Sequence, residues 1–260
     1  MKGAITGDIV GSVYEFDNYR AEDFPLFRND CFFTDDTVMT IAVADALMSA
    51  KGATNEEIIA ALTEKMQFYG RLYPDAGYGG RFAWWLVRDR PKPYNSWGNG
   101  APMRCSAAGW LASSAEEARR LGSLTAMPTH NHPEGIKAAA LTAELIFLAR
   151  KGVDMAALRE RAAREYDLPE IDKIRGTYKF DESSQGTMPV ALSAFFESAS
   201  FEGTVRRAVS AGGDSDTIAA IAGSIAEAYY GVPDDIWSRA EKFLDSRLKA
   251  VVDRFYGLLG

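Results

Sequence analysis

The feature that most constrains this fold is a set of long segments that are apolar on nearly every side at helical spacing. Residues 34–50, 133–149 and 216–230 are such segments, and each is dominated by apolar side chains. A helix that is apolar all round is stable only inside a large bundle that covers every face. Segments that alternate with period two, as strands do, are scarce. We therefore predict an all-α fold, a single compact multi-helix orthogonal bundle of roughly ten to twelve helices, with residues 1–260 forming one domain.

Residues typical of helix starts and stops extend this prediction. Ser, Thr, Asp and Asn are the usual capping residues, and proline suits the first helical position. The further spans expected on these grounds are Thr54 or Asn55 to about Phe68, Asn131 or His132 to Ala149, Asp154 to about Tyr166, and Asp234 to about Phe255.

Two irregular segments interrupt the helical pattern. Residues 16–33 mix aromatic and acidic side chains without a helical stripe, and residues 90–102 contain three Pro and two Gly. Long irregular loops in a compact domain are usually functional or mobile. Residues 176–181 are also expected to form a loop rather than a strand.

Composition excludes several classes of protein. The 29 Lys and Arg against 36 Asp and Glu give a net charge of −7, and such a surface repels nucleic-acid phosphates. No stretch approaches the ~20 uninterrupted apolar residues of a membrane span, and Asp8 interrupts the first apolar run as a signal peptide would not. The two cysteines, Cys31 and Cys105, lack metal-site spacing and are expected to be reduced thiols. We expect a cytoplasmic protein that binds neither membranes nor nucleic acid.

Two of the apolar segments begin with closely spaced acidic residues. One such start alone is explained by helix capping and the helix dipole, which favours carboxylates in the first turn. If the two starts meet, four carboxylates converge, and this is stable only with bound cations or raised pKa values. All-oxygen ligands suit Mg²⁺ or Mn²⁺, and four carboxylates can hold two such ions. The residues concerned are Thr34, Asp35 and Asp36 at one start and Asp214, Asp216 and Thr217 at the other.

Two shorter motifs give weaker signals. Gly98-Asn99-Gly100 resembles a loop that turns into a helix, where backbone N–H groups can bind phosphate, although ordinary turns use the same residues. His130 and His132 are the only histidines, and no third nitrogen or sulfur ligand is near them in sequence. They are therefore expected to cap a helix or to contact a ligand rather than to bind a metal.

Glycines at every fourth position mark the first helix. Gly3, Gly7 and Gly11 share one helix face and are expected to let another helix approach closely. Glu15 continues the same spacing and lies where the irregular segment 16–33 begins. It is either a solvated residue at a helix end or part of a site.

Taken in order, these motifs resemble the ADP-ribosylglycohydrolase family, which includes the dinitrogenase-reductase-activating glycohydrolases and the vertebrate ADP-ribosylhydrolases. No single stretch is decisive, but the ordered set is specific and spans most of the chain. The matching stretches are Gly7–Ser12 with Glu15, Phe33–Thr37, Gly98–Arg104, Thr129-His130, Met188–Leu192 and Gly212–Thr217.

The resemblance implies an all-α fold around a central dinuclear site with two Mg²⁺ or Mn²⁺ ions. The implied metal ligands are Thr34, Asp35, Asp36, Asp214, Asp216 and Thr217. The implied substrate contacts are Gly98, Asn99 and Gly100 beside a diphosphate, with Met103 and His130 nearby. Glu15 matches an acid that some members carry on a mobile flap, and Asp35 and Asp36 are the other candidates for a catalytic acid or base.

The activity implied is metal-dependent hydrolysis of the bond between ADP-ribose and an acceptor, which reverses ADP-ribosylation. Several acceptors fit this implication: a protein side chain such as arginine or serine, a nucleobase, or a small metabolite. One alternative is a catalytically silent relative that only binds ADP-ribose. Another is a magnesium-dependent prenyl diphosphate enzyme, but that class carries Asp-Asp-X-X-Asp inside helices, whereas Asp36 is followed by Thr37-Val38-Met39.

Overall fold

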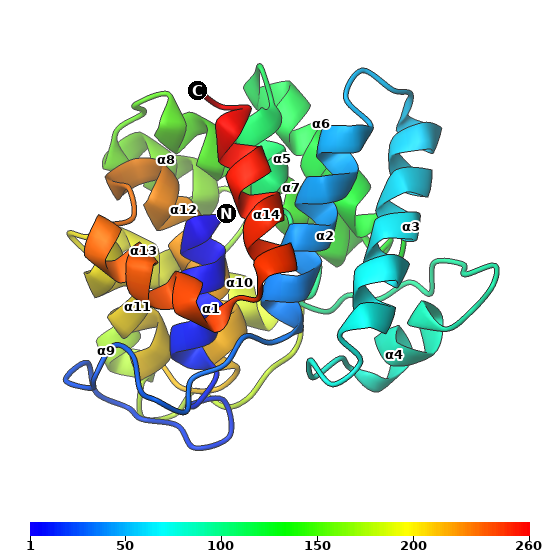
Figure 1. The fold of residues 1–260 in the computed structure, drawn as a ribbon. Helices are drawn as coiled ribbons and strands as arrows, with labels where there is room; N and C mark the ends of the chain where they lie inside the picture. Colours follow the sequence, from blue (N-terminus) through cyan, green and yellow to red (C-terminus); the bar gives the residue numbers. More distant parts are fainter.

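A computed structural model describes residues 1–260 and consists of helices joined by loops (Figure 1). It contains no strand, and the only β-type pairing is an isolated antiparallel bridge between Gly98 and Ser183. The all-α prediction is confirmed. The α-helices are α1 (Lys2–Gly11), α2 (Asp35–Ser49), α3 (Asn55–Leu72), α4 (Gly80–Leu86), α5 (Ser106–Leu111), α6 (Ala115–Ala126), α7 (Pro133–Arg150), α8 (Met155–Ala163), α9 (Ile171–Ile174), α10 (Ser184–Phe196), α11 (Phe201–Ser210), α12 (Ser215–Tyr230), α13 (Asp234–Ala240) and α14 (Ser246–Gly257), and a short 3₁₀ helix spans Glu241–Phe243.

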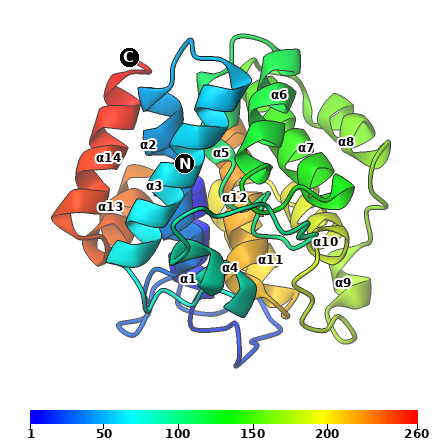
Figure 2. The same cartoon turned by 90° about the vertical axis from the view of Figure 1, so that its right-hand side faces the viewer.

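Helix α12 lies at the centre of the bundle and contacts α1, α7, α10 and α11. Its residues are buried from Ser215 to Glu227, which explains why this segment is apolar on all sides. Helix α2 is covered in the same way by α1, α3, α5 and α14. Figures 1 and 2 both show α1 beside α12 in the middle of the molecule. The two helices that begin with acidic residues are therefore both held in the core.

The glycines of α1 let it pack directly against the backbone of α12, as the sequence predicted. A Cβ atom at Gly3 or Gly7 would lie 2.1 Å from the carbonyl oxygen of Gly223 or Ala219, respectively. At Gly11 a Cβ would lie 2.4 Å from the Cα of Asp216. The contacts run in opposite chain directions, so the two helices are antiparallel.

The structure corrects the prediction for Glu15. Helix α1 ends at Gly11 with Ser12 as its C-cap, so Glu15 does not continue the glycine face. It lies in the turn that follows, at the start of the irregular segment 16–33. Its position therefore depends on the loop rather than on helical spacing.

Most of the predicted helix starts are confirmed. Thr54 caps α3 together with Glu57 in a capping box, and His132 caps α7 directly before Pro133. Residues 176–181 form a loop as expected.

The number of helices was underestimated, because there are fourteen α-helices. The single closing helix predicted from Asp234 to Phe255 is wrong, since the chain breaks near Leu244. There the Asp245 side chain accepts hydrogen bonds from the N–H groups of Arg247 and Leu248 and starts α14. The short helices α4, α5 and α9 are only four to seven residues long, which is too short to show a periodic pattern.

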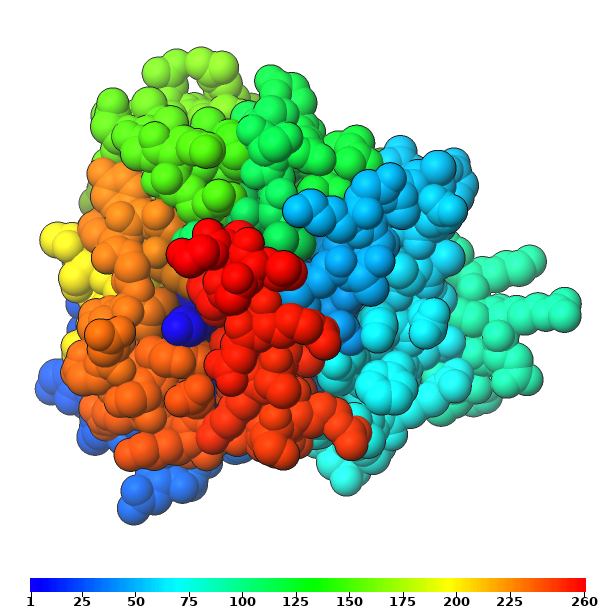
Figure 3. Space-filling model, turned by 45° about the horizontal axis from the view of Figure 1, so that its top comes forward, coloured from blue at the N-terminus to red at the C-terminus, as the bar shows by residue number.

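One cluster of 70 buried apolar residues runs from Met1 to Phe255 and connects all parts of the bundle. Figure 3 shows the start of the chain (dark blue) enclosed between the orange and red segments near its end. Both cysteines are buried free thiols, as predicted. None of the helices combines the length and the apolar composition that a membrane crossing requires.

Candidate active site

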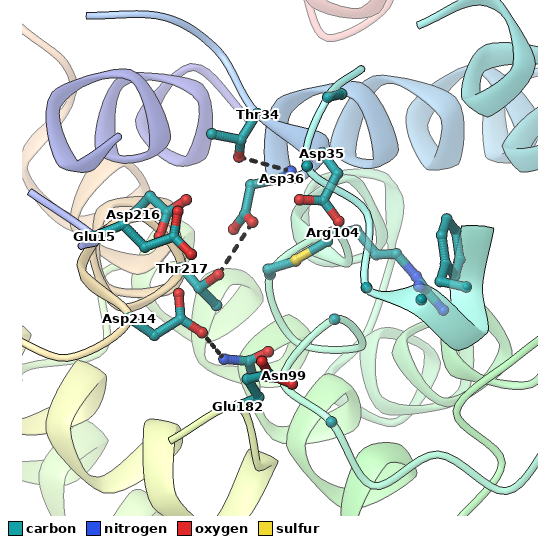
Figure 4. A pocket seen from close by; sticks show the side chains of 18 of the residues that line it. Glu15, Thr34, Asp35, Asp36, Asn99, Arg104, Glu182, Asp214, Asp216 and Thr217 are labelled. Carbon is teal, nitrogen blue, oxygen red and sulfur yellow. Dashed lines mark hydrogen bonds between the residues drawn. The ribbon is translucent and has the colours of Figure 1, made fainter. Parts of the chain in front are cut away.

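All twelve site residues predicted from the sequence line one pocket of about 410 Å³. The pocket forms where the starts of α2 and α12 meet the turn after α1 and the irregular segment 90–102 (Figure 4). We divide its lining into two named parts. The acidic wall comprises Glu15, Thr34, Asp35, Asp36, Asp214, Asp216 and Thr217. The glycine wall comprises Gly98, Asn99, Gly100, Met103 and His130.

The start of α2 is held by a residue that the sequence analysis did not place in the site, Asp8 of α1. Thr34 caps α2 by accepting a hydrogen bond from the Asp36 N–H at 3.2 Å. The Asp8 carboxylate in turn accepts from the Thr34 N–H at 3.0 Å, the Thr34 hydroxyl at 2.7 Å and the Thr37 N–H at 3.0 Å. Burial raises the pKa of Asp8 to about 6, although these hydrogen bonds act in the opposite direction. Asp8 thus fixes α2 against α1 from behind the acidic wall.

The start of α12 differs, because its capping position makes no capping bond. Asp214 occupies that position, but its side chain does not accept from the helix backbone. It instead accepts from the Asn99 side-chain amide at 2.6 Å, and this bond joins the two walls. Gly212 and Gly213 both have positive φ, which lets the chain turn sharply into α12. Asp214 is therefore oriented by Asn99, and its carboxylate faces the pocket.

The two helix starts touch, as the paired acidic motifs suggested. The Thr217 hydroxyl donates to Asp36 Oδ2 at 3.1 Å, from α12 to α2 (Figure 4). Carboxylate oxygens of Glu15, Asp214 and Asp216 lie within 4.8 Å of one another. Glu15 is thereby part of the same cluster, although it comes from a loop.

The acidic wall has more negative groups than the protein itself satisfies. Asp36 Oδ1 and Asp216 Oδ1 are buried and accept no hydrogen bond. Burial raises the pKa of Asp35 to about 8 and that of Glu15 to about 7, and neighbouring carboxylates add to both shifts. Burial likewise raises the pKa values of Asp36 and Asp216 well above their ordinary range. Hard oxygen donors without cationic side-chain partners are the donor set that divalent cations such as Mg²⁺ prefer, so these residues fit a metal site.

The glycine wall is not the start of a helix, which corrects the sequence interpretation. Residues 99–104 form turns, and α5 begins only at Ser106. The Gly98 N–H donates to Ser96 Oγ at 3.2 Å, and the Asn99 N–H donates to the Glu182 carbonyl at 2.8 Å. These groups are used to fix the loop, so the wall owes its shape to the loop's own hydrogen bonds.

The two histidines lie in different places, and only His130 lines the pocket. His132 caps α7, where its Nδ1 accepts from the Glu134 N–H at 3.1 Å. His130 lines the pocket beside Gly98 and Gly100. Burial lowers the pKa of His130 well below its ordinary value, and the charge of Arg104 acts in the same direction. His130 is therefore a neutral imidazole at physiological pH.

Several pocket residues were missed because their signals lie in irregular segments. Phe16 and Phe180 stack with ring centroids 6.1 Å apart, and both line the pocket. The aromatic content of residues 16–33 was visible in the sequence, but nothing local indicated which ring would face the site. Other missed lining residues include Phe32, Asp75, Tyr94, Arg104, Glu182 and, in the short helix α4, Arg81.

Comparison with known proteins identifies the fold and the family. A solved structure titled "ADP-ribosylglycohydrolase-related protein complex" superposes with a TM-score of 0.70 at 24% identity, covering 99% of this chain and 95% of that one. The ADP-ribosylhydrolase ARH3 of Mus musculus is 24% identical over 96% of this chain and 88% of its own. The ADP-ribosyl-[dinitrogen reductase] glycohydrolase of Rhodospirillum rubrum is 31% identical over 87% of this chain and 80% of its own. The ADP-ribosylarginine hydrolase Tri1 of Pseudomonas putida is 29% identical over 89% of this chain and 70% of its own.

The match extends over the whole chain, since the family model described as ADP-ribosylglycohydrolase covers residues 1–260. The ordered motifs, the all-helical fold and the relatives agree. The chain therefore belongs to the ADP-ribosylglycohydrolase family and is an enzyme of that family.

Proposed function

We propose that this enzyme hydrolyses the glycosidic bond between ADP-ribose and an acceptor and requires two Mg²⁺ or Mn²⁺ ions. The observation that carries the proposal is the acidic wall. Its carboxylates cluster in the core, two of their oxygens have no partner, and no Lys or Arg side chain forms an ion pair with any of them. Such a cluster is stable only with cations or added protons.

The metal ligands we propose are Thr34, Asp35, Asp36, Asp214, Asp216 and Thr217. When bound, divalent ions would supply Lewis acidity toward the ribose hydroxyls and a water molecule. The protein's own contribution is to fix the ligands before substrate arrives. Asp8 anchors α2, the Thr217 hydroxyl joins the two helix starts, and Asn99 orients Asp214.

Glu15 is the general base that we propose. It lies on a loop at the pocket, and its carboxylate is within 4.8 Å of those of Asp214 and Asp216. Its pKa is raised to about 7, chiefly by burial, so it can accept a proton from water near neutral pH. Departure of the acceptor leaves positive charge on the ribose, and the remaining carboxylates stabilise that charge. Asp35 and Asp36 are the alternative catalytic carboxylates.

The glycine wall is proposed to bind the diphosphate of ADP-ribose. Gly98, Asn99 and Gly100 form its surface, and Met103 and His130 lie beside them. ADP-ribose carries ribose hydroxyls and a diphosphate in one molecule, so it suits a pocket with one acidic and one neutral wall. The substrate would be an ADP-ribosylated protein or small molecule. The relatives' names describe dinitrogen reductase and arginine as acceptors.

The decisive experiment is turnover on ADP-ribosyl substrates linked through arginine, serine, a nucleobase or a small metabolite. We expect release of ADP-ribose from at least one of them with Mg²⁺ or Mn²⁺ and none with EDTA. Free ADP-ribose should inhibit more strongly than AMP or ribose-5-phosphate, because only ADP-ribose spans both walls. Binding without turnover on every linkage would instead support a silent ADP-ribose-binding relative. Family membership does not favour the prenyl diphosphate alternative.

Three further expectations from the sequence belong to this proposal. We expect a cytoplasmic enzyme. We expect no affinity for nucleic acid, because the net charge of −7 repels phosphate groups. We also expect residues 1–260 to unfold as one domain. Cell fractionation, titration with DNA and RNA, and calorimetric unfolding would test these points.

A further inference from the structure

Arg104 is a fully buried arginine without a carboxylate partner, and the proposed chemistry gives it no task. It is 0% exposed, and its Nη2 donates to the Thr125 carbonyl at 3.1 Å and to the Thr129 hydroxyl at 2.8 Å. Its guanidinium also lies 5.9 Å from the centre of the Phe82 ring. Buried arginines are almost always paired with acids. Burial lowers the pKa of Arg104 only to about 10, so the charge is present at neutral pH.

The Thr129 hydroxyl connects this charge to His130. Thr129 is 0% exposed, and its Oγ1 lies 2.7 Å from His130 Nδ1. An arginine can only donate hydrogen bonds, so Oγ1 accepts from Arg104. If His130 Nδ1 donated as well, the hydroxyl proton of Thr129 would have no acceptor, since Arg104 and His130 are its only polar partners. Buried hydroxyl protons are rarely left without a partner. The Thr129 hydroxyl therefore donates to Nδ1.

The proton of the neutral imidazole must then be on Nε2, which faces the glycine wall. A Cβ at Gly100 would lie 3.0 Å from Nε2, and one at Gly98 would lie 3.4 Å away. The absence of side chains at these two positions leaves Nε2 open to the pocket. The charged or titratable groups that face the ring are Arg104 and Tyr94, whose ring centroid is 6.2 Å from that of His130.

We propose that Arg104 and Thr129 are positioning residues that hold His130 in the neutral Nε2–H tautomer, so that the glycine wall presents one fixed donor to an oxygen of the bound diphosphate. The role of the diphosphate rests on the proposed function, but the tautomer does not. This arrangement explains why Arg104 is buried without a carboxylate partner. It also explains why glycines occupy positions 98 and 100 beside His130.

Imidazole ¹⁵N NMR on the metal-free enzyme tests the tautomer directly. The chain has only two histidines, so a His132→Asn variant, which keeps a good capping residue, assigns the His130 signals. We expect His130 to show a protonated Nε2 and an unprotonated Nδ1 at pH 7. A protonated Nδ1 or an imidazolium at that pH would overturn the proposal, whatever the enzyme hydrolyses.

A variant series then tests the positioning role. Thr129→Val removes the hydroxyl at nearly constant shape, and we expect mixed His130 tautomers and about tenfold weaker ADP-ribose binding with unchanged Mg²⁺ affinity. Thr129→Ser should restore the single Nε2–H tautomer and the ADP-ribose affinity. Thr125→Val is the matched control, because Thr125 contacts Arg104 only through its backbone carbonyl.

The possible results are separable. A Thr129→Val enzyme that keeps the pure Nε2–H tautomer would overturn the positioning role. If that variant does not fold, the wild-type spectrum still decides the tautomer. Failure of the wild-type enzyme to bind ADP-ribose while it shows the Nε2–H tautomer would refute the proposed function and leave the tautomer assignment intact.

Discussion

The two walls of the pocket differ in how completely the protein satisfies them. In the glycine wall, the Asn99 amide and N–H, the Gly98 N–H and the Nδ1 of His130 all have partners within the chain. In the acidic wall, Asp36 and Asp216 each have a buried oxygen without a partner, and their pKa values are raised well above the ordinary range. The comparison teaches that the glycine wall is fixed by hydrogen bonds within the chain, whereas the acidic wall leaves buried carboxylate oxygens that require cations or added protons.

The largest effect is expected from breaking the acidic wall. Asp36→Ala and Asp216→Ala should each lower turnover by at least about a thousandfold, because a bound ion contributes several kcal/mol to the transition state. Both variants should fold, since removing one acid relieves repulsion within the cluster. Calorimetric titration measures the Mg²⁺ affinity, which should be lost in both variants. Unchanged affinity in both would refute a metal site shared by α2 and α12. Asp45→Asn changes an acid of α2 that pairs with Lys65 outside the pocket, and it should bind Mg²⁺ normally.

The next largest effect concerns the loop residue of the acidic wall. Glu15→Gln keeps the shape but removes the basic carboxylate, so turnover should fall by at least about a hundredfold. Affinities for Mg²⁺ and ADP-ribose should stay within a few fold. Glu182→Gln is the control, because Glu182 also lines the pocket and contacts Asn99 only through its backbone carbonyl. Near-normal turnover of Glu15→Gln would move the base role to Asp35 or Asp36, and loss of metal would make Glu15 a ligand.

The stability of the metal-free protein should depend on pH through the same wall. Folding raises the pKa values of Asp8, Glu15 and Asp35 to about 6, 7 and 8, whereas they are about 4 in an unfolded chain. The folded state thus binds more protons between pH ~4 and ~8, so its free energy of unfolding should decrease as pH rises through that window. Below pH ~4 this contribution is fully present.

Magnesium should counteract this loss. At a hundred times its dissociation constant it stabilises by about 2.7 kcal/mol, which raises the melting temperature by roughly 5–10 °C. The rise should be larger at pH 8 than at pH 5, where protons compete for the carboxylates. Thermal melts with EDTA and with Mg²⁺ at the two pH values provide the measurement. Equal midpoints under all four conditions would mean that the acids serve only as helix caps.

The smallest effect is expected from a substitution in the glycine wall. Gly100→Ala places a methyl group 3.0 Å from His130 Nε2, so ADP-ribose should bind about tenfold more weakly while Mg²⁺ affinity is unchanged. Gly80→Ala is the matched control, because Gly80 lines the same pocket and a Cβ there meets nothing within 4 Å. Equal losses in both variants, measured by titration with ADP-ribose, would remove the special role of the surface beside His130.

The parts of the fold that sequence alone could predict are those with strong local signals. The segments of α2, α7 and α12 are apolar all round, and a buried position is the only stable one for such helices. The sequence predicted a carboxylate cluster on the condition that the two acidic helix starts meet, and the Thr217–Asp36 hydrogen bond shows that they do. The division of the last segment into α13 and α14 was missed. Asp is a usual capping residue, but only the hydrogen bonds from the N–H groups of Arg247 and Leu248 show that Asp245 starts a new helix.

The site residues that were missed depend on tertiary contacts. Asp8 was visible as an acid inside an apolar helix, and this is the one signal that could have identified it. Glu182 gave no such signal, and Arg104 was only the last residue of the matching stretch Gly98–Arg104, with no role assigned. Glu182 lines the pocket because its backbone binds Asn99, and Arg104 does so because the turns after Gly100 carry it into the core. Neither relation is encoded in local sequence.

The direct contact between α1 and α12 has a consequence for the metal site that we propose. Since Gly3, Gly7 and Gly11 place the two backbones in contact, the helices are already as close as a packed core permits. Asp8 and Asp216 are carried by these two helices, so they cannot drift apart to relieve their mutual repulsion. The cavity that we propose for the ions is thus preorganised by backbone packing, and a cation entering it need not rearrange the scaffold. Widening the gap with Gly7→Ala would penalise ion capture from a position that touches no ion.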